Sequence, residues 1–231
     1  MLKGNKISIL IPALNEVNSI RYVIKDIPKD IADEIIVIDN GSEDNTSNAA
    51  VESGAKVVYE NRRGYGAACL KGIENLDHPD VVVILDADYS DYPEQMHRLL
   101  NPIVNNEADF VIGSRILGNR EEGALAPQAY WGNNLAVFLI WLLFKYKFTD
   151  MGPFRAIRYE SLKRLNMRDK GFGWNAEMQI KAVKLKLRIK EVPVDYRRRI
   201  GISKISGTIT GTIKAGSKII FTIFRYFFRY L

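Results

Sequence analysis

Short, continuously apolar runs alternate with longer amphipathic stretches along the first half of the chain. The runs are rich in β-branched residues and predict strands at 7–11, 34–39, 56–59, 81–85 and 110–113. The stretches between them predict helices at 16–27, 44–53, 65–76 and 94–105. Continuously apolar strands are typical of a sheet that helices cover on both faces. The pattern therefore predicts an α/β fold around a mostly parallel sheet.

The second half has a less regular pattern. After a loop at 116–129, we predict a helix at 130–147, a strand at 154–158, a helix at 175–186, a strand at 188–198 and a last helix at 208–231. Polar residues that precede two of the earlier helices are candidate caps, namely Asn15 for the first and Ser42 or Asp44 for the second.

Length and composition fit one globular domain with a small appendage. The chain has 231 residues, of which 47% are hydrophobic and 26% charged, so it can bury a substantial core. Its one cysteine, Cys69, cannot form an internal disulfide, which fits a reducing compartment. We expect a main domain at 1–207 and a basic amphipathic helix at 208–231.

Positive charge is concentrated near the C-terminal end. The chain has 33 Lys and Arg against 27 Asp and Glu, and eight of the basic but none of the acidic residues lie between 196 and 231. The remainder is slightly acidic. A basic tail favours anionic partners such as nucleic acid, phospholipid or a phosphorylated substrate.

The predicted last helix is amphipathic. Its polar positions recur at helical spacing: Lys214, Lys218, Thr222, Arg225 and Arg229. Such a helix fits the headgroup plane of a membrane, although packing on the domain or on a partner subunit requires the same pattern. The longest apolar run, 135–144, is too short to span a bilayer, and the N-terminus lacks a signal-peptide pattern. We therefore expect a peripheral protein on the cytoplasmic face of a membrane; an integral-membrane partner or a homo-oligomer stays open.

Polar and acidic residues follow several predicted strands. Ligands of parallel sheets bind beyond these carboxyl ends, so the residues there are candidates for one site. The strongest motif is Asp86-Ala87-Asp88 after the strand 81–85. Two carboxylates on one turn suit a hard divalent cation such as Mg²⁺ or Mn²⁺, which leaves other positions to substrate phosphates. The alternative is an aspartate pair that caps the next helix.

Two more motifs belong to the same predicted edge. Asp39 ends the second strand, where its carboxylate can accept a hydrogen bond from a nucleobase beside Gly41. An ordinary strand-turn-helix without a ligand would explain the same sequence. The segment NRRGYGAAC after the third strand offers Arg63 and backbone donors to a diphosphate. It is a poor dinucleotide-binding motif, because Cys69 replaces the third glycine and the segment does not follow the first strand.

The order LIPALNE, IDNGSEDNT, RRGYGAA, LDADYSDYP, IGSR closely resembles family 2 glycosyltransferases of the dolichol-phosphate mannose synthase kind. The resemblance implies a GT-A sandwich fold and a nucleotide-diphosphate sugar donor. It places Asp86 and Asp88 at the metal and diphosphate, with Arg115 nearby. The family often has two aspartates where this chain has Asp39-Asn40, which leaves the base, uracil or guanine, open. The implied nucleotide site comprises Pro12, Leu14, Glu16, Asp39, Gly41, Arg63, Asp86 and Ala87.

Motifs in the second half resemble the acceptor side of polyprenyl-phosphate sugar transferases. They are TDMGPFRAIR, GFGWNAEMQIKA and VPVDYRRRIGISKISG. Asp150 and Glu177 stand where such enzymes place acids near the transferred sugar, or each is a structural partner of an arginine. Candidate donors to the acceptor phosphate lie on one loop that a solvated basic segment would also explain: Arg197, Arg199, Ser203 and Lys204.

Together these features predict a metal-dependent, inverting glycosyltransferase in which a polyprenyl or dolichyl phosphate attacks the anomeric carbon. A phosphate monoester is largely dianionic at pH 7 and needs no general base, whereas a sugar hydroxyl would need one, either Asp150 or Glu177. The alternatives are a soluble phosphorylated or glycan acceptor and a non-enzymatic membrane-binding module. Acids at the ligand edge argue against nucleic acid. The expected catalytic residues are Asp88, Arg115, Asp150 and Glu177.

Overall fold

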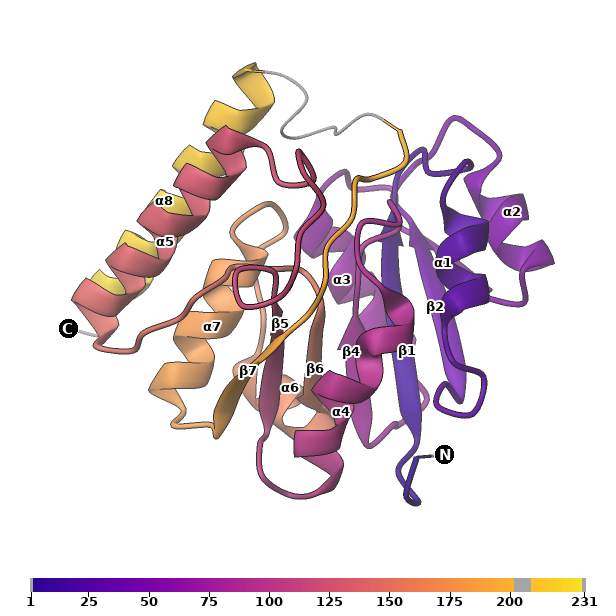
Figure 1. Cartoon of the computed structure of the whole chain (residues 1–231), viewed down its shortest axis with the longest axis horizontal. Coiled ribbons are helices and arrows are strands. Elements are labelled where there is room, and N and C mark those ends of the chain that lie inside the picture. Colours follow the sequence, from indigo (N-terminus) through magenta and orange to yellow (C-terminus); the bar gives the residue numbers. More distant parts are fainter. Residues whose placement is uncertain (1, 202–208, 230–231) are drawn as a thin grey trace.

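The computed structural model describes residues 2–201 and 209–229, which build a seven-stranded sheet with helices on both faces (Figure 1). The strand order is β3-β2-β1-β4-β6-β5-β7, and neighbouring strands run parallel except where β6 pairs with β4 and β5. The predicted α/β fold with a mostly parallel sheet is confirmed. The strands are β1 Ile7–Ala13, β2 Glu34–Asp39, β3 Lys56–Tyr59, β4 Val81–Ile84, β5 Phe110–Ser114, β6 Arg155–Arg158 and β7 Ile189–Pro193.

Helices form two layers around this sheet. Helices α1, α2 and α4 share one core with the first face, and α3, α6 and α7 share a second core with the other. Helices α5 and α8 lie side by side at one end, where both contact α7 (Figure 1). The helices are α1 Ile20–Asp26, α2 Thr46–Glu52, α3 Tyr65–Glu74, α4 Met96–Val104 after the 3₁₀ turn Pro93–Gln95, α5 Pro127–Phe144, α6 Tyr159–Leu165, α7 Trp174–Lys184 and α8 Ile209–Arg229.

The central strand β1 shows why its run is apolar except at Ser8. Ile7, Ile9 and Ile11 belong to the core beneath α1 and α4, whereas Leu10 belongs to the opposite core. Side chains alternate between faces along a strand, and here both faces are covered. Each buried aliphatic side chain contributes about 1.5–3 kcal/mol, so the run anchors both layers at once.

Helix α1 begins at Ile20, four residues later than predicted, because Asn15 does not cap it. Asn15 adopts φ 53°, in the left-handed region, and the residue that precedes α1 is Ser19. Its N–H donates to Ser42 Oγ at 3.0 Å and its Oδ1 accepts the N–H of Glu43 at 2.7 Å. Asn15 therefore ties the loop after β1 to the loop after β2.

Other element boundaries also differ from the sequence prediction. Asp44, not Ser42, bonds to the start of α2, since its Oδ1 accepts the N–H of Thr46 at 3.0 Å. The predicted strand 188–198 ends at Pro193. Helix α5 begins at Pro127, three residues earlier than predicted. Proline suits this position because N–H groups in the first turn of a helix have no partner within the helix. Helix α6 was not predicted, since its seven residues are too few for a clear apolar period.

Helix α8 packs against α5 and α7, and its predicted polar stripe is not an exposed face. Thr222 is buried and Lys218 pairs with Asp169 across 3.0 Å, whereas Phe221 and Phe228 are 59% and 68% exposed. The helix therefore turns part of its polar stripe inward and several aromatic residues outward. Within the described ranges, no helix combines the length and hydropathy needed to cross a bilayer. The predicted boundary at 207/208 lies outside the described residues.

Candidate active site

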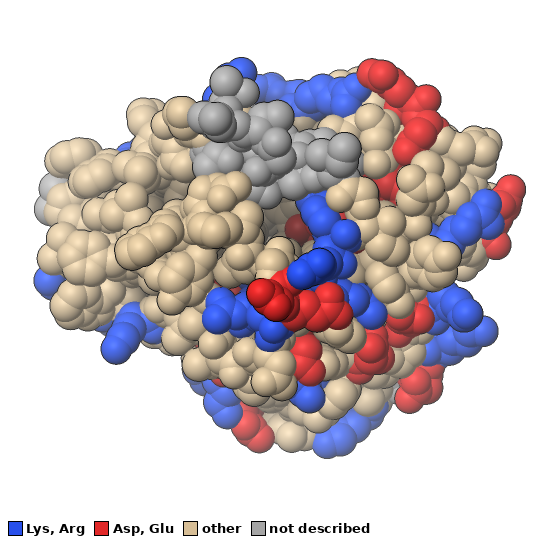
Figure 2. Space-filling model, turned by 45° about the horizontal axis from the view of Figure 1, so that its top comes forward, with Lys and Arg blue, Asp and Glu red and all other residues tan. Residues whose placement is uncertain are grey.

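A cleft of about 480 Å³ opens beyond the carboxyl ends of β1, β2 and β4. The loops after these strands supply most of its wall, and the loop before α7 supplies Gly171 and Phe172. Figure 2 shows a hollow near the middle of the view with Lys and Arg side chains along one side. The predicted residues that line the cleft are Pro12, Leu14, Glu16, Arg63, Asp86, Ala87, Asp88 and Arg199.

The acid pair lies at the floor of this cleft. Asp88 is 6% exposed, and its Oδ1 accepts the N–H of Ser90 at 2.9 Å. Burial, and then the nearby Asp88 carboxylate, raise the pKa of Asp86 to about 7. Arg199 and Arg115 oppose that shift. Two carboxylates that repel each other in a buried place favour a cation between them.

The carboxylates suit a cation that completes its coordination elsewhere. In the described part of the chain, no group of three or more His, Cys, Asp or Glu is placed to hold a metal ion. Mg²⁺ takes one or two carboxylates and keeps positions for phosphates and water, and a hard Mn²⁺ behaves similarly. Asp86 and Asp88 therefore fit a divalent ion that binds together with a diphosphate.

Arg199 joins two carboxylates inside the cleft. Its Nη1 lies 3.0 Å from Asp88 Oδ2, and its Nη2 donates to Glu16 Oε1 at 3.0 Å. Its buried Nε has no hydrogen-bond partner among the described residues. Two carboxylates thus hold the guanidinium in the cleft, and a guanidinium so placed is a candidate donor to phosphate oxygens.

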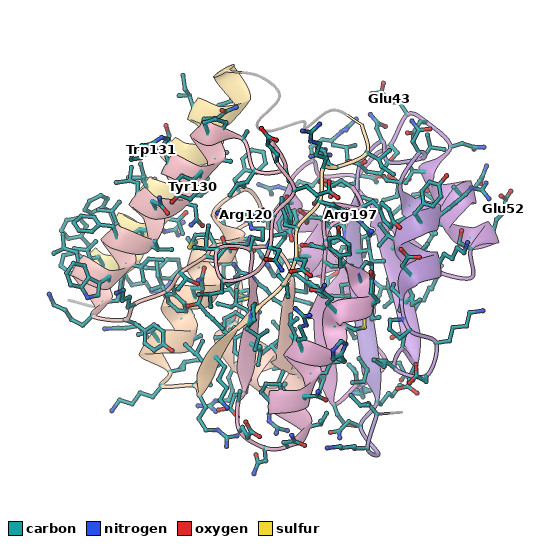
Figure 3. The ribbon with its side chains drawn as sticks, viewed as in Figure 1. Glu43, Glu52, Arg120, Tyr130, Trp131 and Arg197 are labelled. Atoms are coloured by element: carbon teal, nitrogen blue, oxygen red, sulfur yellow. The ribbon has the colours of Figure 1, made fainter. Side chains whose placement is uncertain are left out.

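The neighbouring arginines have other partners in this structure, and contact of Arg197 with the acceptor phosphate stays a prediction. Arg197 stacks on the rings of Tyr89 and Tyr92, with its Cζ 3.3 and 4.2 Å from their centroids, and its Nε donates to Tyr89 O at 2.6 Å (Figure 3). Arg198 donates to Glu122 O at 2.6 Å. Ser203 and Lys204 lie outside the described residues.

Asp39 and Gly41 lie beside the cleft and are engaged within their own loop. Asp39 is 4% exposed, and its carboxylate accepts the N–H of Ser42 at 2.7 Å and the hydroxyl of Ser47. Gly41 adopts φ +83° under the guanidinium of Arg63. A carboxylate has about four acceptor positions, so contact of Asp39 with a nucleobase stays a prediction.

Asp150 is an ion-pair partner of Arg115 behind the cleft. Arg115 Nε and Nη2 donate to the two carboxylate oxygens at 2.8 and 2.7 Å, and the Arg115 N–H adds a third bond at 2.8 Å. Asp150 is fully buried. Such a bidentate pair fixes both side chains and engages both carboxylate oxygens of Asp150, so the catalytic roles of the two residues stay predictions.

Glu177 is also fully buried and has four partners. It accepts the N–H groups of Arg168 and Asp169 at 2.9 and 2.6 Å, and the hydroxyl of Tyr226 at 2.5 Å. Lys181 Nζ lies 2.6 Å from Glu177 Oε1. The residue joins α7 to α8 and does not line the cleft.

Asn40, a lining residue that the sequence analysis did not assign to the site, shapes its wall. Its Nδ2 donates to Glu60 O at 2.9 Å and to Arg62 O at 2.8 Å, and its Oδ1 accepts the N–H of Gly64 at 2.7 Å. An amide is needed here, because a carboxylate cannot donate to two carbonyl groups. The departure from the paired aspartates of the family was the signal for this role.

The glycines of RRGYG serve packing. A Cβ on Gly66 would lie 2.1 Å from Asp169 O, so only glycine permits this approach. The N–H groups of Gly66 and Ala67 donate to Gly171 O and Lys170 O at 3.3 and 3.1 Å. The expectation that these backbone donors face a diphosphate is therefore corrected: they bond to the loop before α7. Tyr65 and Phe172 also line the cleft; they lie within the motifs RRGYGAA and GFGWNAEMQIKA, but the sequence analysis did not single them out as site residues.

Residues 8–165 match the family described as Glycosyl transferase family 2. The chain belongs to glycosyltransferase family 2.

Two relatives illustrate the enzymes in this family to which the chain is similar. It is 31% identical over 211 residues to the UDP-N-acetylglucosamine–dolichyl-phosphate N-acetylglucosaminyltransferase of Methanococcus voltae, covering 81% of this chain and 84% of the relative. It is 30% identical over 229 residues to the undecaprenyl-phosphate mannosyltransferase of Micrococcus luteus, covering 87% and 88%. The predicted enzyme class, glycosyltransferase, is confirmed.

The fold of this family 2 glycosyltransferase is shared with glucosyl-3-phosphoglycerate synthase of Mycobacterium tuberculosis. The structure of that enzyme in complex with Mn²⁺, UDP and phosphoglyceric acid has a TM-score of 0.80 at 24% identity, covering 97% of this chain and 79% of that one. At this identity the likeness shows the fold, and it confirms the GT-A prediction.

Proposed function

We propose that this glycosyltransferase moves a sugar from a nucleoside-diphosphate sugar to a polyprenyl or dolichyl phosphate, with inversion at the anomeric carbon. Two family members with over four-fifths coverage in both directions are named for prenyl-phosphate acceptors. The volume of the cleft, and a lining that combines apolar side chains with a few carboxylates and arginines, support a nucleotide donor.

The donor end of the reaction rests on the acid pair and the cleft arginines. Asp86 and Asp88 would hold Mg²⁺ or Mn²⁺, which supplies charge neutralisation for the departing diphosphate. Arg199 and Arg63 line the same cleft and can donate to phosphate oxygens. Pro12 and Leu14 offer an apolar wall that keeps water from the nucleoside.

The observation that favours a phosphate acceptor is the state of the two candidate bases. Asp150 is bonded bidentately to Arg115, and Glu177 is paired with Lys181; both are fully buried. Among the described residues, the carboxylates that line the cleft are Glu16, Asp86 and Asp88. Asp86 and Asp88 are assigned to the metal, and Glu16 is paired with Arg199. A dianionic phosphate attacks without a base, whereas a sugar hydroxyl requires one.

An exposed aromatic surface supports a lipid-borne acceptor. It is formed by the outer sides of α5 and α8, where Trp131 is 72% exposed and projects from α5 (Figure 3). Figure 2 shows that this end of the molecule, on the left, carries few charged side chains. Aromatic residues on interfacial helices suit the boundary between headgroups and acyl chains. The aromatic surface comprises Trp131, Phe138, Trp141, Phe221, Phe224 and Phe228.

A soluble phosphorylated acceptor is the second candidate, because the structural neighbour was crystallised with phosphoglyceric acid. To test both, the protein is incubated with Mn²⁺, a panel of UDP- and GDP-sugars, and either polyprenyl phosphate or phosphoglyceric acid. Mass spectrometry should detect a sugar linked to polyprenyl phosphate, and Asp88→Ala should abolish it. Transfer to phosphoglyceric acid alone would overturn the lipid acceptor.

A further inference from the structure

The loop that precedes α7, residues 168–173, connects the cleft to α8. We call it the Asp169 loop. On one side its Gly171 and Phe172 form part of the cleft wall. On the same side Lys170 O and Gly171 O accept the N–H groups of Ala67 and Gly66 in the first turn of α3. The position of this loop therefore sets both the wall of the cleft and the start of α3.

Asp169 holds the loop in its turn. Its Oδ1 accepts the N–H groups of Gly171 and Gly173 at 2.7 and 3.2 Å, while its Oδ2 lies 3.0 Å from Lys218 Nζ of α8. The Asp169 side chain is 5% exposed. A buried carboxylate with bonds to two main-chain groups and one ammonium is fixed in place, and each bond to a charged group contributes more than a neutral one.

Glu177 holds the start of the same loop. It accepts the N–H groups of Arg168 and Asp169, and its Oε1 also accepts the Tyr226 hydroxyl from α8. Tyr226 is 4% exposed, so this contact is shielded from water. Two residues of α8, eight positions apart on one helix face, thus reach the two carboxylates that shape the loop.

We propose that Lys218 and Tyr226, together with Glu177, are positioning residues for donor binding. They keep the Asp169 loop against α3, so that Gly171 and Phe172 form the cleft wall that a nucleotide requires. This role rests on the proposed function, because it needs the cleft to bind a nucleotide. It also gives α8, which carries part of the aromatic surface, a direct structural link to the donor site.

The test compares nucleotide binding by wild-type chain, Lys218→Met, Tyr226→Phe and the double variant. UDP and GDP are titrated calorimetrically in the presence of Mn²⁺, and hydrogen exchange is followed in residues 168–173. Lys163→Met is the matched control, because it removes an exposed ion pair with Glu160 on α6. Lys218→Arg tests rescue, since it retains the charge that Asp169 needs.

For the double variant we expect an increase in nucleotide Kd of about tenfold, because both contacts from α8 that hold the Asp169 loop are lost. Exchange in 168–173 should accelerate, donor KM should rise more than kcat falls, and Lys218→Arg should restore most of the affinity. Lys163→Met should bind as the wild-type chain does.

Two results overturn the proposal in different ways. If the wild-type chain binds a nucleotide and the double variant binds it equally well, the positioning role is wrong while the proposed function stands. If the wild-type chain binds neither UDP nor GDP with Mn²⁺, the proposed function fails and the positioning role fails with it. Thermal melting of each variant distinguishes unfolding of the whole protein from displacement of the Asp169 loop alone.

Discussion

Arg199 and Asp88 form an ion pair in the cleft, with Arg199 Nη1 3.0 Å from Asp88 Oδ2. The same guanidinium bonds to Glu16, so it links the loop after β1 to the loop after β4. Without ligand, Asp88 holds the Arg199 guanidinium in the cleft. If a cation then binds Asp88, the guanidinium is already in position to bind a phosphate. Its neighbour Arg198 bonds instead to Glu122 O, outside the cleft.

Arg199→Met is expected to weaken nucleotide binding, because it removes a charge-assisted donor from the cleft. The loss of one such interaction, about 1.5–3 kcal/mol, corresponds to roughly 10–100-fold in Kd. Arg198→Met is the matched control, since Arg198 bonds to Glu122 O outside the cleft. Titration of UDP and GDP with Mn²⁺ measures both variants. Equal affinities for the two variants would contradict the assignment of Arg199 to the site.

Asn40→Asp is expected to destabilise the protein and weaken donor binding. The new carboxylate would face Glu60 O and Arg62 O, which now accept from the amide. A buried charge against two carbonyl groups costs about 2–3 kcal/mol, which corresponds to roughly 5–10 °C in Tm for a chain of this size. The control is Asn48→Asp, an exposed amide on α2. A Tm unchanged in both variants would show that the amide is not required.

Asp86→Asn is expected to stabilise the metal-free protein at high pH. Burial, and then Asp88, raise the pKa of Asp86 to about 7 from its ordinary value of 3.8. Between these values the folded state binds more protons than the unfolded state, so the stability of the wild-type chain decreases as pH rises from about 4 to 7. The variant lacks this loss.

Thermal melting in EDTA checks this expectation. At pH 8 the Tm of Asp86→Asn should exceed that of the wild-type chain, by about 2–4 °C for each kcal/mol by which the ionised Asp86 carboxylate destabilises the folded state. At pH 4 most of this difference should be gone, because the folded wild-type carboxyl is then neutral and the unfolded one is only about half ionised. Other titrating groups are shared by the two proteins and cancel in the difference. A Tm difference that is the same at both pH values would contradict the raised pKa.

Replacement of Trp131 and Phe138 by Ser is expected to reduce binding to lipid vesicles. Each aromatic side chain that enters an apolar phase contributes about 1.5–3 kcal/mol, so the double variant should lose at least tenfold in affinity. Co-sedimentation with vesicles that contain anionic phospholipid measures this. Tyr59→Ser is the control, because Tyr59 is 63% exposed but lies on β3, at the far edge of the sheet from α5. Equal losses in the two proteins would refute a specific membrane face.

The strands and the acid pair were accessible from the sequence because local pattern determines them. Buried parallel strands are apolar throughout, and β1, β2, β3 and β4 begin at the residues predicted. Acids directly after such strands must lie at the carboxyl edge, which placed Asp86 and Asp88 in one cleft with Glu16.

Long-range contacts explain what the sequence did not reveal. Asn15 looked like a helix cap, but contacts with Ser42 and Glu43, almost thirty residues away, determine its conformation. Three consecutive arginines look alike in a sequence, yet only their partners separate the stacked Arg197 from Arg199 in the cleft. Phe172 lies in a loop that α8 contacts through the pair of Asp169 with Lys218, and no local pattern encodes a contact between residues so far apart in the chain.

The central claim is that a cation held by Asp86 and Asp88 binds the diphosphate of the donor. Calorimetric titration of UDP and GDP into the wild-type chain and Asp88→Ala, each with Mn²⁺ and with EDTA, tests it most directly. We predict that one nucleotide binds the wild-type chain only with Mn²⁺, and that Asp88→Ala remains folded but does not bind it. Equal nucleotide affinity with Mn²⁺ and with EDTA, or in Asp88→Ala and the wild-type chain, would contradict the claim.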